Sequence, residues 1–211
     1  PDRVRWVAGA VSEVEGLVTA SGRNFYGGLL ARDSFNGLRL WHHDLGRGIT
    51  NGTEFKLPNL SANLARPVAS DNYLFAISKG KLVCFNASTG EMIRTFEGLA
   101  QPRDLIYHRS TVIATDATSI RAYSAQTGLE IWKHEFAEAR NIAAINEIVT
   151  LIHGRPNRGE PSKSTALDLY TGKPKWEKAD GYLDKVYRTV MFGDQIAYEV
   201  SSLNDNDKGN A

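Results

Sequence analysis

The stretch that decides the fold is "IRAYSAQTGLEIWKHE" (residues 120–135). It alternates like a β-strand up to a Thr-Gly pair, and Trp132 follows four residues after Gly128. Three other stretches repeat this order of residues: "LLARDSFNGLRLW" (29–41), "LVCFNASTGEMIR" (82–94) and "STALDLYTGKPKW" (164–176). The chain therefore contains four copies of one unit, aligned on a glycine.

Each shared column of the repeat has a physical reason. A tight turn requires positive φ, which glycine adopts at little cost. The turn glycines are Gly37, Gly90, Gly128 and Gly172. The Asp, Asn or Ser four residues before each glycine can accept hydrogen bonds from nearby N–H groups and hold the turn closed. The residue two positions before that one is small, which allows strands to approach closely; it is Ala31, Cys84, Ala122 and Ala166.

The last column holds a tryptophan in three of the four copies. These residues are Trp41, Trp132 and Trp176. A tryptophan offers a large apolar face and one N–H donor, so we expect it to pin one unit to the next. The second copy has Arg94 instead, and we expect Phe96, two residues further along the same strand face, to replace the missing ring.

The spacing of the repeats predicts a β-propeller. The turn glycines lie 53, 38 and 44 residues apart, which fits four-stranded blades of about 40 residues. Segments rich in β-branched and aromatic residues lie between the turns: 72–78, 110–116, 147–154, 185–192 and 195–202. We predict a single all-β propeller domain over residues 1–203, with four clear blades, a fifth beginning near residue 185, and a polar tail at 204–211. A different all-β meander or sandwich with coincidental Thr-Gly turns is the alternative.

The repeat resembles that of the quinoprotein-type, or PQQ-like, β-propellers, whose pattern is A-x-D-x-x-T-G-x-x-x-W. The clearest matches are "ARDSFNGLRLW" (31–41), "AYSAQTGLEIW" (122–132) and "ALDLYTGKPKW" (166–176). Proteins of this family, including bacterial multidomain members, often have seven or eight blades. The resemblance therefore makes this chain a candidate part of a larger propeller, and it implies a periplasmic or extracellular location.

The resemblance also raises pyrroloquinoline quinone (PQQ) and calcium as cofactors. In the dehydrogenases that carry this repeat, the quinone lies under a vicinal disulfide, beside a calcium held by acidic side chains. This chain has one cysteine, Cys84, so the disulfide is absent. Cys84 occupies the small-residue column and is expected to pack as a small hydrophobe. PQQ and calcium are thus possible but unsupported, and the cofactor-binding residues are unknown.

We assign no catalytic or metal-binding residues. No motif for a nucleophile elbow, a zinc protease or a phosphate-binding loop occurs. Adjacent strand side chains face opposite ways, so His42 and His43 cannot easily share one ion. "DNDKG" (205–209) resembles part of a calcium loop, but a polar tail is the preferred interpretation. Three aspartates outside the repeat columns have no pattern partner: Asp104, Asp116 and Asp184.

Charge and hydropathy bound the possible partners. The net charge is +1, from 25 basic and 24 acidic residues, which gives no reason to expect nucleic acid. No apolar run reaches the roughly 18 residues of a membrane span.

"HGRPNRGEPSKS" (153–164) predicts a long loop within a blade. Its cations are Arg155, Arg158 and Lys163, which could meet an anionic partner or remain a solvated loop.

The sequence leaves three functions open. The leading hypothesis is a non-catalytic propeller that acts as a binding or scaffold module, with a protein or other domains of a longer chain as its partner. One alternative is a fragment of a PQQ-dependent oxidoreductase, which would need a quinone in the axial funnel with an acid-bound metal beside it. The other is a carbohydrate-handling propeller, which an aromatic-lined pocket would support.

Overall fold

The computed structural model describes residues 18–26, 30–42, 67–78, 80–155, 159–180, 182–192 and 195–200. These residues form four four-stranded antiparallel sheets and one two-stranded sheet. Every sheet is a meander, in which each strand pairs with its neighbour in the chain. The predicted all-β fold class is therefore confirmed, and the four sheets correspond to propeller blades.

We call the four-stranded sheets blades A to D and the two-stranded sheet E. Blade A contains β1 (Val18–Ala20), β2 (Arg23–Tyr26), β3 (Leu30–Asp33) and β4 (Arg39–His42). Blade B contains β5 (Val68–Ala69), β6 (Tyr73–Ser78), β7 (Lys81–Asn86) and β8 (Met92–Phe96). Blade C contains β9 (Asp104–His108), β10 (Thr111–Thr115), β11 (Ser119–Ser124) and β12 (Glu130–Glu135). Blade D contains β13 (Arg140–Ile145), β14 (Ile148–His153), β15 (Lys163–Asp168) and β16 (Pro174–Ala179). Sheet E contains β17 (Val186–Phe192) and β18 (Gln195–Val200), after a short 3-10 turn at Leu183–Lys185.

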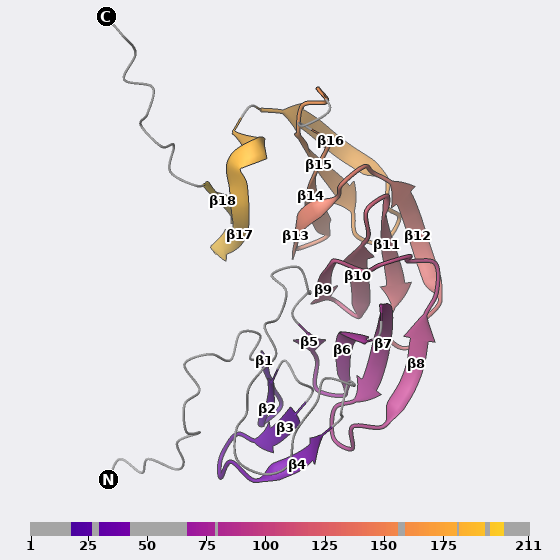
Figure 1. The fold of residues 1–211 in the computed structure, drawn as a ribbon, viewed down its shortest axis with the longest axis vertical. Coiled ribbons are helices and arrows are strands. Elements are labelled where there is room, and N and C mark those ends of the chain that lie inside the picture. Colours follow the sequence, from indigo (N-terminus) through magenta and orange to yellow (C-terminus); the bar gives the residue numbers. More distant parts are fainter. Residues whose placement is uncertain are drawn as a thin grey trace, which may run out of the picture.

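The blades follow one another along an arc, with the last strand of each blade on the outside (Figure 1). The first strands of successive sheets pack against one another on the inside: β1 against β5, β5 against β9, β9 against β13, and β13 against β17. Sheet E thus continues the series after blade D. Its two strands occupy the place of the first two strands of a following blade.

The hydrophobic core lies between neighbouring blades, because each strand sends alternate side chains to opposite faces of its sheet. Phe25 and Trp41 of blade A pack with Leu74 and Phe85 of blade B. The junction of blades B and C is formed chiefly by Phe75, Cys84, Phe96, Leu105, Val112 and Tyr123. The junction of blades C and D is formed chiefly by Ile113, Ile120, Trp132, Ile142, Leu151 and Leu167.

Cys84 is fully buried in the junction of blades B and C. Burial raises the pKa of its thiol to about 11, although the nearby Arg94 guanidinium opposes the shift. The thiol is therefore protonated near neutral pH and packs as a small apolar group.

Several stretches named in the sequence analysis lie outside the described residues. These are His43, Arg158 and the predicted tail at 204–211. The stretch 153–164 connects β14 to β15 within blade D, with residues 156–158 outside the described part.

Candidate functional site

The turn that ends at the repeat glycine has the same glycine conformation in all four blades. Gly37, Gly90, Gly128 and Gly172 have φ values of 74°, 75°, 79° and 69°. In blade D the Asp168 carbonyl accepts a hydrogen bond from Gly172 N at 2.8 Å, and Asp168 Oδ1 accepts from the N–H groups of Tyr170 and Thr171 at 3.1 and 3.0 Å. Asp33 and Asn86 hold the turns of blades A and B in the same way. The Asx side chain therefore works locally, within its own turn.

A bulge follows each turn at one fixed position. We call the last residue of each repeat the docking residue. The small residue of the repeat pairs with it in every blade: Ala31 with Trp41, Cys84 with Arg94, Ala122 with Trp132, and Ala166 with Trp176. The register shifts by one residue immediately after that pair in every blade. A bulge re-aims the side chains next to it, so it sets the direction of the docking residue.

Two of the three repeat tryptophans, Trp41 and Trp132, lie on the turn glycine of the next blade. A Cβ atom built on Gly172 would be only 2.7 Å from Trp132 Cδ2, and one on Gly90 would be 2.6 Å from Trp41 Cδ2. The indole N–H also donates to a carbonyl of the next blade: Trp41 to Ala87 O at 3.0 Å, and Trp132 to Leu169 O at 2.8 Å. Glycine is thus needed twice, for its φ and for the space above it.

Arg94 itself fills the docking position that lacks a tryptophan. A Cβ on Gly128 would be 2.8 Å from Arg94 Cδ, and Arg94 Nη1 donates to Ala125 O. The stem of Arg94 thus replaces the indole face, and its guanidinium replaces the indole N–H. Phe96, the substitute expected from the sequence, instead packs edge-on against Tyr123 with ring centroids 5.2 Å apart.

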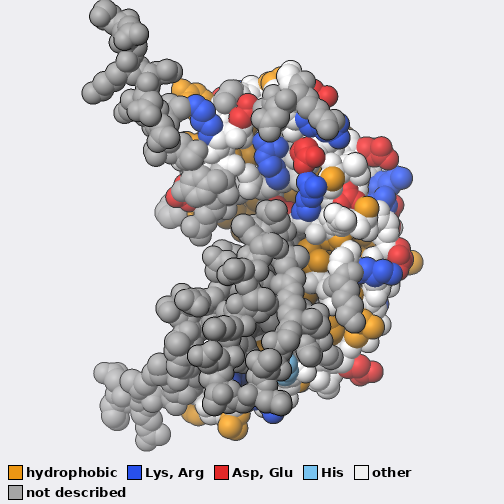
Figure 2. Space-filling view, viewed as in Figure 1, with side chains coloured by type: hydrophobic (Ala, Val, Ile, Leu, Met, Phe, Trp, Pro, Cys, Tyr) orange, Lys and Arg blue, Asp and Glu red, His pale blue; other side chains and the backbone are white. Residues whose placement is uncertain are grey.

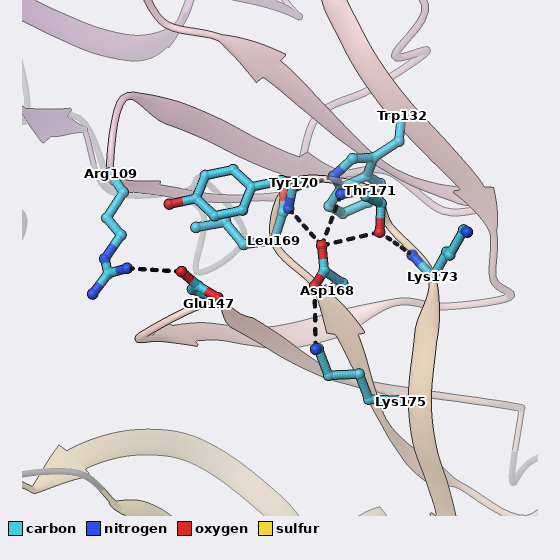
Figure 3. Close-up of polar contacts among 9 residues, drawn as sticks. All are labelled: Arg109, Trp132, Glu147, Asp168, Leu169, Tyr170, Thr171, Lys173 and Lys175. Carbon is cyan, nitrogen blue, oxygen red and sulfur yellow. Dashed lines mark hydrogen bonds and ion pairs between the residues drawn. The ribbon is translucent and has the colours of Figure 1, made fainter.

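Figure 3 shows the docking corner between blades C and D. Trp132 of β12 lies beside the turn, and Asp168 lies at its centre. Asp168 Oδ2 also forms an ion pair with Lys175 Nζ at 3.1 Å. The hydrogen bonds from Lys175 and Thr171 lower the pKa of the Asp168 carboxyl to about 2. Arg109 Nη1 and Glu147 Oε1 form an ion pair at 3.7 Å, which joins the β9–β10 turn of blade C to the β13–β14 turn of blade D.

The outer strands present a repeated apolar position that sequence reasoning missed. Leu40, Ile93 and Ile131 are all exposed, and each occupies the bulge of β4, β8 or β12. The aligned repeats contain the signal for this row, because each residue stands three positions after the turn glycine. Blade D has Lys175 at that position. We call Leu40, Ile93 and Ile131 the rim row.

The predicted loop cations have different environments. Lys163 begins β15 and forms an ion pair with Glu177 Oε1 at 2.7 Å. Arg155 is half-buried, and its carbonyl accepts a hydrogen bond from Glu160 N at 3.1 Å. Basic and acidic side chains are interspersed on the face shown in Figure 2. A site for an anionic partner at this loop stays a prediction.

The aspartates without a pattern partner do not form a metal centre with one another. Asp104 is half-buried beside β13, where its carboxylate accepts hydrogen bonds from Ile142 N at 3.2 Å and Leu105 N at 3.1 Å. Burial raises the pKa of Asp104 despite these bonds. Asp116 accepts from Thr118 and Ser119 beside it in the chain, and from Ala100 N in the connection between β8 and β9.

The His, Cys, Asp and Glu side chains of the described residues are not gathered into one centre. No group of three or more His, Cys, Asp or Glu side chains there could hold a metal ion. His134 and His153 both contact Phe136, with ring centroids 5.8 and 4.4 Å apart, while His108 Nε2 lies 2.9 Å from Asn146 O. In the same part of the chain, no helix is long and apolar enough to cross a membrane.

The comparisons with known proteins identify the family. A family model described as the outer membrane protein assembly factor BamB matches residues 7–134, which is more than half of the sequence. The chain belongs to the BamB family. The suspected PQQ-like repeat is confirmed. No curated protein matches the sequence.

Solved structures support the same fold. BamB from Moraxella catarrhalis matches with a TM-score of 0.59 and 14% identity, over 87% of this chain and 54% of that chain. The quinohemoprotein alcohol dehydrogenase ADHIIG from Pseudomonas putida matches with a TM-score of 0.58 and 12% identity, over 86% of this chain and 37% of that chain. The quinohemoprotein alcohol dehydrogenase from Comamonas testosteroni matches with a TM-score of 0.54 and 15% identity, over 87% of this chain and 38% of that chain. The chain therefore spans about half the length of this BamB and less of each dehydrogenase.

Proposed function

We propose that this BamB-family chain is a non-catalytic propeller that acts as a scaffold and binds a protein partner along the rim row. The observation that carries the proposal is the exposure of Leu40, Ile93 and Ile131 at one structural position of three consecutive blades. Removing apolar surface from water is the main favourable term in protein association. A regularly spaced row on a rigid array suits an extended protein surface better than a small molecule.

The family description supports a protein partner. It names an assembly factor of outer membrane proteins, and such a factor handles other proteins. By the same likeness we propose a periplasmic or extracellular location for this chain. The dehydrogenases in the comparison share the fold alone.

The test is site-specific photo-crosslinking in the source cells. A photoreactive residue at Ile93 or Ile131 should crosslink to one common protein. A matched probe at Lys178, which is exposed on the outer strand of blade D but lies outside the rim row, should not. With that protein purified, we expect Ile93→Ser and Ile131→Ser to weaken binding about tenfold each, and Lys178→Ser to leave it unchanged.

Equal crosslinking at residues 93, 131 and 178 would contradict the rim row as a binding surface. Calorimetric titration of PQQ, with and without calcium, tests the oxidoreductase alternative. Tight stoichiometric binding to the folded chain would overturn the non-catalytic assignment. We expect no binding, because the carboxylates of Asp104, Asp116 and Asp168 accept backbone hydrogen bonds within a blade or from the next blade.

A further inference from the structure

The turn of blade A differs from the other three in the residue before its glycine. Blade A has Asn36 there, and the other blades have a threonine: Thr89, Thr127 and Thr171. Asn36 and Gly37 form one of the two Asn-Gly pairs in the sequence. In such a pair the glycine nitrogen can attack the asparagine side chain, because glycine has no Cβ that would hinder the approach. The turn of blade A thus contains a dipeptide whose chemistry the other turns lack.

The reaction open to this dipeptide is deamidation. The Gly37 nitrogen bonds to Cγ of Asn36, the bond from Cγ to Nδ2 breaks, and the side-chain nitrogen leaves as ammonia with the proton of the Gly37 N–H. The product is a five-membered succinimide. Water then opens this ring at one of its two carbonyls. Opening at the side-chain carbonyl gives aspartate, and opening at the main-chain carbonyl gives isoaspartate, which adds one CH2 group to the main chain.

The closed turn holds the groups that this reaction uses. Gly37 is buried, although Asn36 is exposed, and Gly37 N donates to Asp33 O at 2.9 Å. The nitrogen must lose this bonded proton before it can attack. Arg32 Nη1 donates to Gly37 O at 2.7 Å and fixes the same glycine from its carbonyl side. The Asn36 side chain is also held, because its Oδ1 accepts a hydrogen bond from Leu38 N at 2.8 Å.

The side-chain oxygen of Asn36 replaces the threonine hydroxyl of the other turns. In each of those turns the threonine Oγ1 accepts a hydrogen bond from the N–H two residues further on. These bonds join Thr89 to Glu91 at 3.2 Å, Thr127 to Leu129 at 3.3 Å and Thr171 to Lys173 at 3.3 Å. The amide group that would react in deamidation is therefore the group that closes the turn of blade A.

We propose that Asn36 is a deamidation site that the closed turn of blade A protects and that reacts only when this turn opens. Local opening releases the Gly37 N–H and the Asn36 side chain together, because both are held within one turn. Isoaspartate then lengthens the main chain at the turn, so the original hydrogen bonds cannot form again and Trp41 loses its position on Gly90. The proposal does not depend on the proposed function.

The test compares the rate of deamidation at residue 36 in the full chain and in a peptide of residues 29–41, at one pH and temperature. Mass spectrometry of proteolytic peptides, after chromatographic separation, quantifies aspartate and isoaspartate at this position. We expect the full chain to react about tenfold more slowly than the peptide, or more slowly still, because the turn must open first. Asn36→Thr is the control for the assignment and should give no product at residue 36.

Two perturbations of the full chain test whether opening of the turn controls the rate. Asp33→Ala removes the carboxylate that accepts from Phe35 N at 2.9 Å and from Asn36 N at 3.0 Å, so it should speed deamidation severalfold. Urea below the unfolding transition should speed the wild-type reaction, because urea favours states with more exposed surface. Equal rates in the full chain and the peptide would overturn the proposal. So would a slow rate that neither perturbation raises.

The isoaspartate form tests the consequence for blade A. Once purified, it should have a lower Tm than the variant Asn36→Asp, which carries the same charge on an ordinary main chain. Equal Tm values for these two proteins would show that the turn closes again after the reaction, and would overturn this part of the proposal.

Discussion

At the turn glycines, two separate costs exclude a side chain. One is backbone strain, because φ is positive at Gly172 as it is at Gly80. The other is space: a Cβ on Gly172 would lie 2.7 Å from Trp132, whereas one on Gly80 would have no atom within 4 Å. The chain thus contains a natural control that separates strain from contact.

We expect Gly172→Ala to destabilise the fold clearly more than Gly80→Ala. Gly80→Ala should cost about 1–2 kcal/mol, which is the strain of a left-handed non-glycine residue. Gly172→Ala should add about 1–3 kcal/mol, because Trp132 must move. Urea unfolding followed by circular dichroism measures both values. Equal losses would show that Trp132 does not press on the turn.

The lowered pKa of Asp168 predicts a contribution to stability that depends on pH. Its folded pKa of about 2 lies below the ordinary value of 3.8, so the ionised form stabilises the fold. That contribution is complete above about pH 4 and is lost as the pH falls toward 2. Asp168→Asn keeps an acceptor in the turn, as Asn86 does in blade B, but removes the charge that pairs with Lys175.

We therefore expect the wild-type chain to lose more stability than Asp168→Asn between pH 4 and pH 2. Unfolding midpoints in urea at several pH values in this range provide the measurement. Parallel curves for the two proteins would indicate that the Lys175 pair contributes nothing to the folded state.

At the scale of the element, the outer strand of each blade connects that blade to the next. The bulge after the turn directs one side chain across the junction, and the three closed junctions use Trp41, Arg94 and Trp132 for this contact. The unit of stability is therefore the pair formed by an outer strand and the following turn, not the blade alone.

Trp132→Ala should destabilise the fold by about 3–5 kcal/mol, since it empties a buried site and leaves Leu169 O without its donor. Trp176→Ala removes the same residue from an exposed position of the repeat and should cost less than about 1 kcal/mol. Both values come from chemical denaturation at neutral pH. Similar losses for the two variants would count against docking as the source of the energy.

The docking role of Arg94 predicts how substitutions at this position change the stability of the fold. Arg94→Met keeps an apolar stem over Gly128 but leaves Ala125 O without its donor, and should cost about 1–3 kcal/mol. Arg94→Trp restores both the apolar face and an N–H donor, so it should be more stable than Arg94→Met. Thermal and urea unfolding of the two variants decide this. Wild-type stability in Arg94→Met would show that the hydrogen bond is dispensable.

At the scale of the whole molecule, the arc is a linear array of sheets whose cores lie between them. Blades B, C and D each contribute to two cores, whereas sheet E shares only the small one that contains Ile152 and Val186. In such an array, local opening is easiest where the fewest buried contacts are lost.

The rate of amide hydrogen exchange should therefore differ along the chain, from slow in the central blades to fast in sheet E. The amides of β10 and β14, whose strands are almost completely buried, should exchange slowest. Those of β17 and β18 should exchange fastest among the described strands of blades B to D and sheet E. Peptide-resolved exchange with mass spectrometry gives the order. Uniform protection from β10 to β18 would contradict the graded array.

The sequence predicted most of the fold because the repeat is local. The Asx residue and the glycine lie four positions apart, so a turn of this kind forms from short-range hydrogen bonds. The candidate rim row could have been read from the same alignment, as a column of Leu and Ile three residues after the glycine. Its exposure could not, because an aliphatic side chain on a strand is more often buried than exposed.

By itself, the sequence determined the all-β class, the blade-sized repeat and the positions of the four turns. Only the tertiary structure decided which side chain covers which glycine, because that contact joins residues of two different blades. It assigned the docking role to Arg94 rather than Phe96, since an arginine stem and guanidinium can reproduce an indole face and its N–H. It also distinguished Trp132 from Trp176, which are equivalent in the repeat but differ in whether a turn covers them.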